Sequence, residues 1–91
     1  MKNNDFLRSP LVVVAEDLAN CHVFRQGYDS FIRNKKFCEF QDLGTQTRFE
    51  RGRLFAAYCK AEAMYRVWTY SNLTGHGIDL LINALATKAI I

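Results

Sequence analysis

Catalysis needs nucleophiles, acids and bases at particular spacings, and this 91-residue chain offers few of them. Its five glycines are dispersed, so no glycine-rich loop could cradle a phosphate, and no serine stands in the context of a nucleophile elbow. A cysteine–histidine pair would need the fold to bring His22 or His76 to Cys38 or Cys59. We therefore expect that the protein is not an enzyme.

The cysteines and histidines are also poorly spaced for a metal ion. Cys21, Cys38 and Cys59 are far apart, and none belongs to a Cys-x-x-Cys pair. Cys21 and His22 are adjacent, so on a helix they would point about 100° apart and could not easily share an ion. We expect no metal and no cofactor. Three cysteines cannot all pair, which favours reduced thiols in a cytoplasm over a disulfide framework.

Basic and aromatic residues gather in the middle of the chain, and this pattern indicates binding. Nine lysines and arginines lie within residues 25–66 against five acidic residues, whereas only Asp79 and Lys88 are charged after Arg66. Aromatic rings among cations can stack on unpaired bases while the cations hold phosphates. The alternative is that the rings form the core and the charges form a solvated face. The candidate residues for contact with RNA or with a protein partner are Lys35, Lys36, Phe37, Phe40, Arg48, Arg51 and Arg53.

The composition is typical of one globular domain. It is 49% hydrophobic and 23% charged, which excludes a disordered tail. The longest apolar runs, residues 11–15 and 54–59, are much shorter than the ~20 residues of a membrane span. The net charge of +3 is lower than is usual for a dedicated nucleic-acid binder. We expect a single soluble domain over residues 1–91.

Helices are the elements that must position the candidate residues. Ser9-Pro10 is typical of a helix start, because serine can cap and proline suits the first helical position. From Leu11 to Ile32, positions that would share one helix face recur at spacings of three and four. The spacing predicts a helix over residues 10–34, after a loose N-terminus at residues 1–8.

Two further helices are expected after a loop. Residues 35–47 show no sustained period and indicate the loop. Thr47-Arg48-Phe49-Glu50 fits a capping box, which predicts a helix over residues 48–69. After a break, spaced apolar residues predict a third amphipathic helix over residues 77–90. The expected fold class is all-α, a helix–loop–helix with a third, C-terminal helix.

The second and third helices carry more apolar surface than we expect one small chain to bury. The second is apolar nearly all round, which is typical of a helix buried on more than one side. Two-fold pairing of two chains would bury both surfaces, so we expect a homodimer. The alternative is that the third helix folds back on its own chain. The residues assigned to the dimer contact are Tyr65, Trp68, Ile78, Leu81, Ile82 and Leu85.

Three groups of residues in the middle of the chain match a known family, whose spacing is kept from Cys38 to Ala56, although the stretch from Gly27 to Cys38 is about two residues shorter than the family predicts. They are Gln26-Gly27-Tyr28, then Cys38-Glu39-Phe40-Gln41-Asp42-Leu43, then Phe49, Gly52 and Ala56. With this spacing, residues 26–56 resemble the ribosome modulation factor family of small bacterial helix–loop–helix proteins. The resemblance implies binding to the ribosome near the decoding end of the small-subunit RNA, and the promotion of inactive ribosome dimers in resting cells.

The resemblance also implies roles for individual residues. Tyr28, Phe40, Phe49 and Gly52 would define the fold, and the basic residues beside them would contact RNA. The chain departs from the family at Glu39, where proline is usual, and at Phe49, where tryptophan is usual. An apolar C-terminal helix also extends it beyond the family's usual end, as an interaction element would.

From these patterns we expect a small cytoplasmic regulator of translation that binds structured RNA or the ribosome. The alternative is an inhibitor of the phage or mobile-element type, which binds and blocks a host or defence protein. The basic residues favour the first hypothesis, and the apolar C-terminal extension favours the second.

Overall fold

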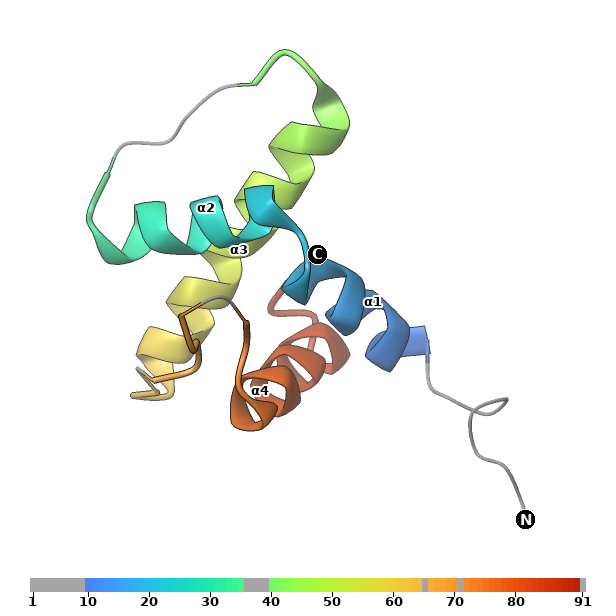
Figure 1. Ribbon diagram of the computed structural model, residues 1–91, viewed down its shortest axis with the longest axis vertical. Helices are drawn as coiled ribbons and strands as arrows, with labels where there is room; N and C mark the ends of the chain where they lie inside the picture. Colours follow the sequence, from blue (N-terminus) through green and yellow to red (C-terminus); the bar gives the residue numbers. More distant parts are fainter. Residues whose placement is uncertain (1–9, 36–39, 65, 71, 91) are drawn as a thin grey trace.

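The computed structural model describes residues 10–35, 40–64, 66–70 and 72–90. These residues form four α-helices: α1 (Pro10–Ala19), α2 (His22–Ile32), α3 (Leu43–Ala61) and α4 (Gly75–Ala86) (Figure 1). The expected all-α fold is confirmed. The expectations for residues 1–8 and for Lys36, Phe37 and Tyr65 lie outside the described residues. None of the described helices combines the length and the apolar character needed to cross a bilayer.

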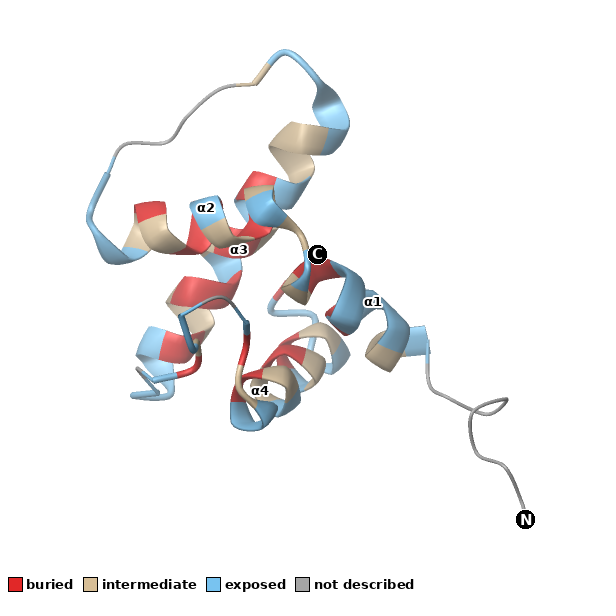
Figure 2. Cartoon of the chain, viewed as in Figure 1, coloured by how far each residue is buried: buried red, intermediate tan, exposed pale blue. Residues whose placement is uncertain are grey.

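The helices pack as two pairs around one core. Helix α2 crosses α3, and α1 lies along α4 beside this crossing (Figure 1). Buried residues gather where α2 meets α3 and on one side of α4 (Figure 2). The buried core cluster consists of Ala15, Leu18, Phe24, Tyr28, Phe55, Ala56, Cys59, Val67, Leu73, Leu81, Ala84 and Ile90.

Two glycines set the approach of α2 to α3. A Cβ atom on Gly27 would collide with the carbonyl oxygen of Phe49, and one on Gly52 would collide with the carbonyl oxygen of Phe24. Neither glycine has a positive φ, so the lack of a side chain, rather than backbone freedom, is what the crossing requires. The close approach lets the Phe24 and Phe55 rings stack with their centroids 5.7 Å apart.

The predicted helix over residues 10–34 is wrong, because the chain forms two helices there. Helix α1 ends at Ala19, and Cys21 adopts an extended conformation before α2 begins. The Asn20 side-chain nitrogen donates to the Glu16 carbonyl at 2.9 Å, so it satisfies an acceptor at the end of α1. The break lets α1 leave the α2–α3 pair and cover α4, where it buries Ala15 and Leu18. Because α1 and α2 each bury one apolar face, the apolar spacing of three and four residues continues through the break, although the helix does not.

The predicted helix over residues 48–69 is wrong at both ends. Helix α3 begins at Leu43 because Asp42 is its N-cap: the Asp42 carboxylate accepts from the Thr45 backbone N–H at 2.8 Å. Thr47 lies inside the helix, and its hydroxyl donates to the Leu43 carbonyl. The helix ends before Ala63, whose φ of 58° stops the helical path. The expected loop over residues 35–47 therefore extends too far at its C-terminal end.

A short connector joins α3 to α4 and packs against α2. Its described residues include an isolated antiparallel bridge between Trp68 and Leu73. The Thr74 hydroxyl then caps α4 by accepting from the Gly77 N–H at 2.9 Å. Helix α4 therefore begins before the predicted residue 77, and it ends at Ala86, before the predicted residue 90.

The residues assigned to a dimer contact that the structure describes pack against the core of their own chain. Leu81 is completely buried in the core, where it is unavailable to a second chain, so its assigned role is corrected. Ile78, Ile82 and Leu85 are half-buried against the same core. Trp68 lies on the connector, and its ring meets Tyr28 edge-on at 5.5 Å. Helix α4 thus folds back on its own chain. The break between α1 and α2 lets α1 turn toward α4 and cover it.

Candidate nucleic-acid interface

A groove opens between the end of α2 and the beginning of α3. Its cavity of about 500 Å³ is lined by two cations, Arg33 and Lys35, and by Phe40 and Phe49, among others. We call this cavity the basic groove. The structure thus brings together Lys35 and Phe40 of the sequence-predicted set, and it adds Arg33 and Phe49.

The two aromatic rings form one wall of the basic groove. Phe49 is buried, Phe40 is half-buried, and their ring centroids are 5.1 Å apart. The Phe40 backbone N–H donates to the Gln46 side-chain oxygen at 2.6 Å, which ties the chain before α3 to the helix itself. Phe40 therefore packs on one side and has some ring surface left for a ligand. A partly exposed ring of this kind can stack on a base.

The two cations stand at the turn that ends α2. Arg33 is the C-cap, and Asn34 adopts a positive φ of 55°, a conformation that asparagine tolerates. The turn closes when the Lys35 N–H donates to the Ser30 carbonyl at 2.9 Å. Both cations are exposed, and their position beyond the C-terminus of α2 suits the negative end of the helix dipole.

Arg53 supports this turn instead of facing solvent. Its guanidinium donates to the Ser30 hydroxyl at 3.0 Å and to the Lys35 carbonyl at 3.3 Å. It also lies over the Phe31 ring, 5.7 Å from the centroid. Arg53 was expected to contact a phosphate, which stays a prediction, and the structure adds a contact with the turn that carries Lys35.

Arg48 and Arg51 lie on α3, but neither is among the residues that line the basic groove. Arg48 is exposed, and Arg51 is half-buried. Sequence reasoning missed Arg33, although only Asn34 separates it from the Lys35-Lys36 pair. The signal was present in this short basic run, which begins inside the predicted first helix.

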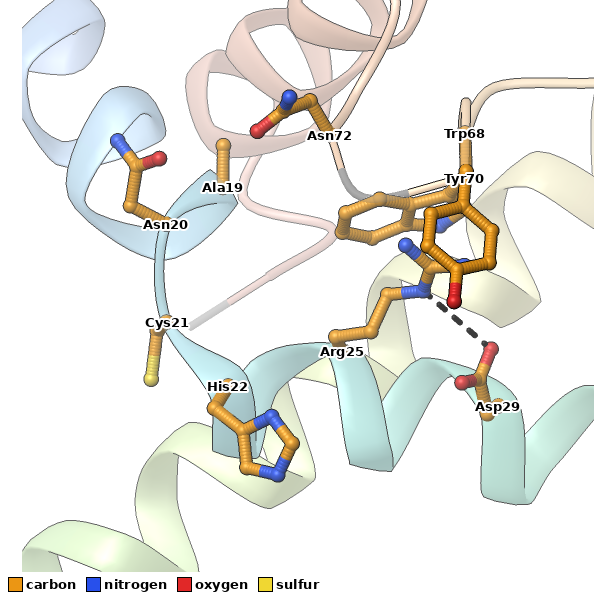
Figure 3. Close-up of a pocket in the computed structure, with 9 residues that line it drawn as sticks. All are labelled: Ala19, Asn20, Cys21, His22, Arg25, Asp29, Trp68, Tyr70 and Asn72. Carbon is orange, nitrogen blue, oxygen red and sulfur yellow. Dashed lines mark ion pairs between the residues drawn. The ribbon is translucent and has the colours of Figure 1, made fainter.

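A second cavity, of about 490 Å³, lies at the corner between α1 and α2, where the connector crosses (Figure 3). The Arg25 guanidinium lies 4.2 Å from the centroid of the Trp68 ring. The Arg25 Nε lies 3.7 Å from an Asp29 carboxylate oxygen. Tyr70 lines the opening and is completely exposed. We call this site the Trp68 cavity.

Sequence reasoning also missed the Trp68 cavity. It placed Trp68 at the end of a helix and Arg25 on the same helix face as core residues. The available signal was Arg25 itself, a cation at an apolar position of the period with Asp29 four residues on. Only the connector brings an aromatic ring to this pair.

The buried thiol among the nucleophile candidates is unreactive. Burial raises the pKa of Cys59 to about 11, so the thiol stays protonated at neutral pH. Burial also raises the pKa of the neighbouring Tyr28 phenol well above its ordinary value. Within the described ranges, no three histidine, cysteine or acidic residues come close enough together to hold a metal ion.

No protein-family model matches the chain, and neither the curated proteins nor the solved structures contain a match to it. The resemblance of residues 26–56 to the ribosome modulation factor family therefore stays a prediction. Two residues that carry it, Gly27 and Gly52, make the backbone contact between α2 and α3. Any pair of helices this close needs small residues at the crossing, so the contact fits the expected role in the fold.

Proposed function

We propose that the protein is a non-enzymatic regulator that binds structured RNA through the basic groove. The observation that carries the proposal is a single cavity whose lining includes two exposed cations, Arg33 and Lys35, and two phenylalanines, Phe40 and Phe49. Arg33 and Lys35 would pair with phosphates, and the open part of the Phe40 ring would stack on an unpaired base. Cations beside aromatic rings in one cavity suit a nucleotide strand, which offers phosphates and bases together.

The surroundings of the groove support the same function. Asp29 also lines it, but Arg33 and Lys35 outnumber this one carboxylate, so the groove keeps a positive balance. Arg53 holds the turn that carries Lys35, which lowers the conformational entropy lost when RNA binds. The ribosome is our first choice of RNA, because residues 26–56 resemble a ribosome-binding family. A cytoplasmic role in translation follows from that choice.

The test is RNA binding at a series of salt concentrations, with ribosomal small subunits as the probe. Replacing both Arg33 and Lys35 by alanine should weaken binding. It should also lower the slope of log affinity against log salt by about 0.7–0.9 for each lost phosphate contact.

The matched control is the double replacement of Lys60 and Arg66 by alanine. Both are exposed cations away from the groove, so the same charge is removed elsewhere. The control should change the slope little. Equal slopes for the two double variants would refute the proposed groove.

Blocking a protein partner is the second candidate function, and a different cavity favours it. This cavity of about 440 Å³ lies between α2 and α3 and is lined in part by Phe31, Leu54 and Ala57. Its apolar wall and the 40% exposure of Leu54 suit a hydrophobic contact with an inhibited host or defence protein. Capture from lysate with and without ribonuclease separates the functions, since only an RNA-dependent partner is lost with the RNA.

A further inference from the structure

The Trp68 cavity places a carboxylate and a guanidinium side by side at an aromatic opening (Figure 3). The Asp29 side chain is 40% exposed, and its ion pair with Arg25 is long, at 3.7 Å. A carboxylate can accept up to four hydrogen bonds, so Asp29 has capacity for a ligand. The Nε atoms of Arg25 and Trp68 are buried without a hydrogen-bond partner among the described residues. An oxygen acceptor entering the cavity would relieve this unfavourable burial after a small side-chain shift.

The charge of the cavity selects a neutral base over a phosphate. The charges of Arg25 and Asp29 cancel, so the cavity attracts a phosphate only weakly, whereas the two Asp29 oxygens can accept two neighbouring N–H groups at once. Guanine presents such a pair, N1–H and the N2 amino group, next to the O6 acceptor, which Arg25 can bind. The completely exposed ring of Tyr70 offers a stacking surface at the mouth of the same cavity.

We propose that the Trp68 cavity binds an unpaired guanine of the RNA. This inference rests on the proposed function, because the guanine would belong to the strand whose phosphates lie in the basic groove. Asp29 lines both cavities, so the two adjoin along α2. Arg25 and Arg33 are eight positions apart, about 12 Å along a helix axis, which a short stretch of RNA can span.

The ring of Trp68 supports Arg25 from one side. Trp68 packs edge-on against Tyr28 and also meets the Phe24 ring, with centroids 6.4 Å apart. These contacts restrain the indole, which lies against the Arg25 guanidinium beside Asp29. A donor and an acceptor held in this way can read the edge of a base, because their geometry exists before the ligand arrives.

Free mononucleotides test the cavity apart from RNA binding. Trp68 is the single tryptophan, so its fluorescence, excited at the red edge where bases absorb little, reports the cavity alone. GMP should change this fluorescence at about tenfold lower concentration than AMP, CMP or UMP. Asp29→Asn should remove the preference for GMP, since an amide has one acceptor oxygen. Glu62→Gln also replaces a carboxylate by an amide, at an exposed residue that caps α3. It should leave the preference for GMP intact.

Tyr70→Ala provides a second variant that cannot disturb the core, because the side chain is completely exposed. It should weaken the binding of all four mononucleotides at least about fivefold.

Equal responses to the four nucleotides, or a GMP response unchanged in Asp29→Asn and Tyr70→Ala, would overturn the guanine site. If GMP binds as expected but the Arg33 and Lys35 variant keeps the wild-type salt slope for RNA, the proposed groove fails and the cavity stands. If RNA binds through the groove but no mononucleotide changes the fluorescence, the guanine site fails and the proposed groove stands.

Discussion

Gly52 is the residue at which one added carbon should matter most. A Cβ atom there would collide with the Phe24 carbonyl and would lie 2.9 Å from the Tyr28 nitrogen, and helix backbone cannot move aside like a side chain. Gly52→Ala should therefore lower the free energy of unfolding by at least about 1–3 kcal/mol, the usual cost of overpacking. Urea denaturation followed by circular dichroism measures the loss.

Gly75→Ala is the matched control for this substitution. A Cβ atom on Gly75 would meet nothing within 4 Å, so the variant should be as stable as the wild type or slightly more stable. Similar losses at both glycines would show that the crossing is looser than the structure indicates.

Arg53 shows why residue roles cannot be read from charge alone. Its basic neighbours made it a candidate for phosphate contact, but its guanidinium is engaged with the Ser30 hydroxyl and the Lys35 carbonyl. A planar guanidinium can satisfy two acceptors at once, which suits it to join α3 to the turn after α2. Its neighbours in the sequence do not reveal those acceptors, because they lie on a different element.

The N-terminus of α3 should make stability depend on pH. Hydrogen bonds from Thr45, first from its backbone N–H and then from its hydroxyl, hold the pKa of Asp42 below its ordinary value. The charged carboxylate therefore stabilises the folded chain above the ordinary pKa of aspartate. This stabilisation disappears as the pH falls through the lowered pKa.

Asp42→Ala should thus be less stable than the wild type at neutral pH and should approach it in acid. Asp42→Asn retains a capping oxygen but has no charge to titrate, so it should keep much of the stability without this pH dependence. Denaturation at several pH values measures all three proteins. Parallel curves for the wild type and Asp42→Ala over the acid range would contradict this account of the cap.

At the scale of the whole molecule, Leu81 tests whether α4 belongs to its own chain. The side chain is completely buried without any partner chain, so Leu81→Ala should cost about 2–5 kcal/mol of folding free energy. The loss should be the same at every protein concentration. A difference between wild type and variant that changes with protein concentration would mean that a second chain helps to bury Leu81.

The homodimer stays a proposal, now resting on the half-buried Ile78, Ile82 and Leu85 of α4. If these residues pair two chains, light scattering should give twice the 10.5 kDa chain mass. A wild-type protein that keeps the single-chain mass at high micromolar concentration would contradict self-association. That result would leave the fold of one chain untouched.

The all-α class and the existence of helical segments could be predicted from the sequence, because the apolar period is a local property of each segment. The ends of the helices could not. The period runs through Asn20 and Cys21, but the chain breaks there so that α1 can cover α4. The capping pattern at Thr47 was a reasonable start for α3, yet Asp42 caps it earlier.

Some residues of the candidate site could likewise be predicted from the sequence, and others could not. Lys35 and Phe40 could be found from the sequence, because the basic run and the aromatic residues that suggested them are close together in the chain. The partners that give these residues their positions, Phe49 and Arg53, come from another helix. Trp68 and Arg25 are farther apart still, and only the path of the connector brings the ring onto the guanidinium. Local patterns determine which segments become helices, whereas contacts between distant residues depend on how the helices share one core, and that packing is decided by the whole chain at once.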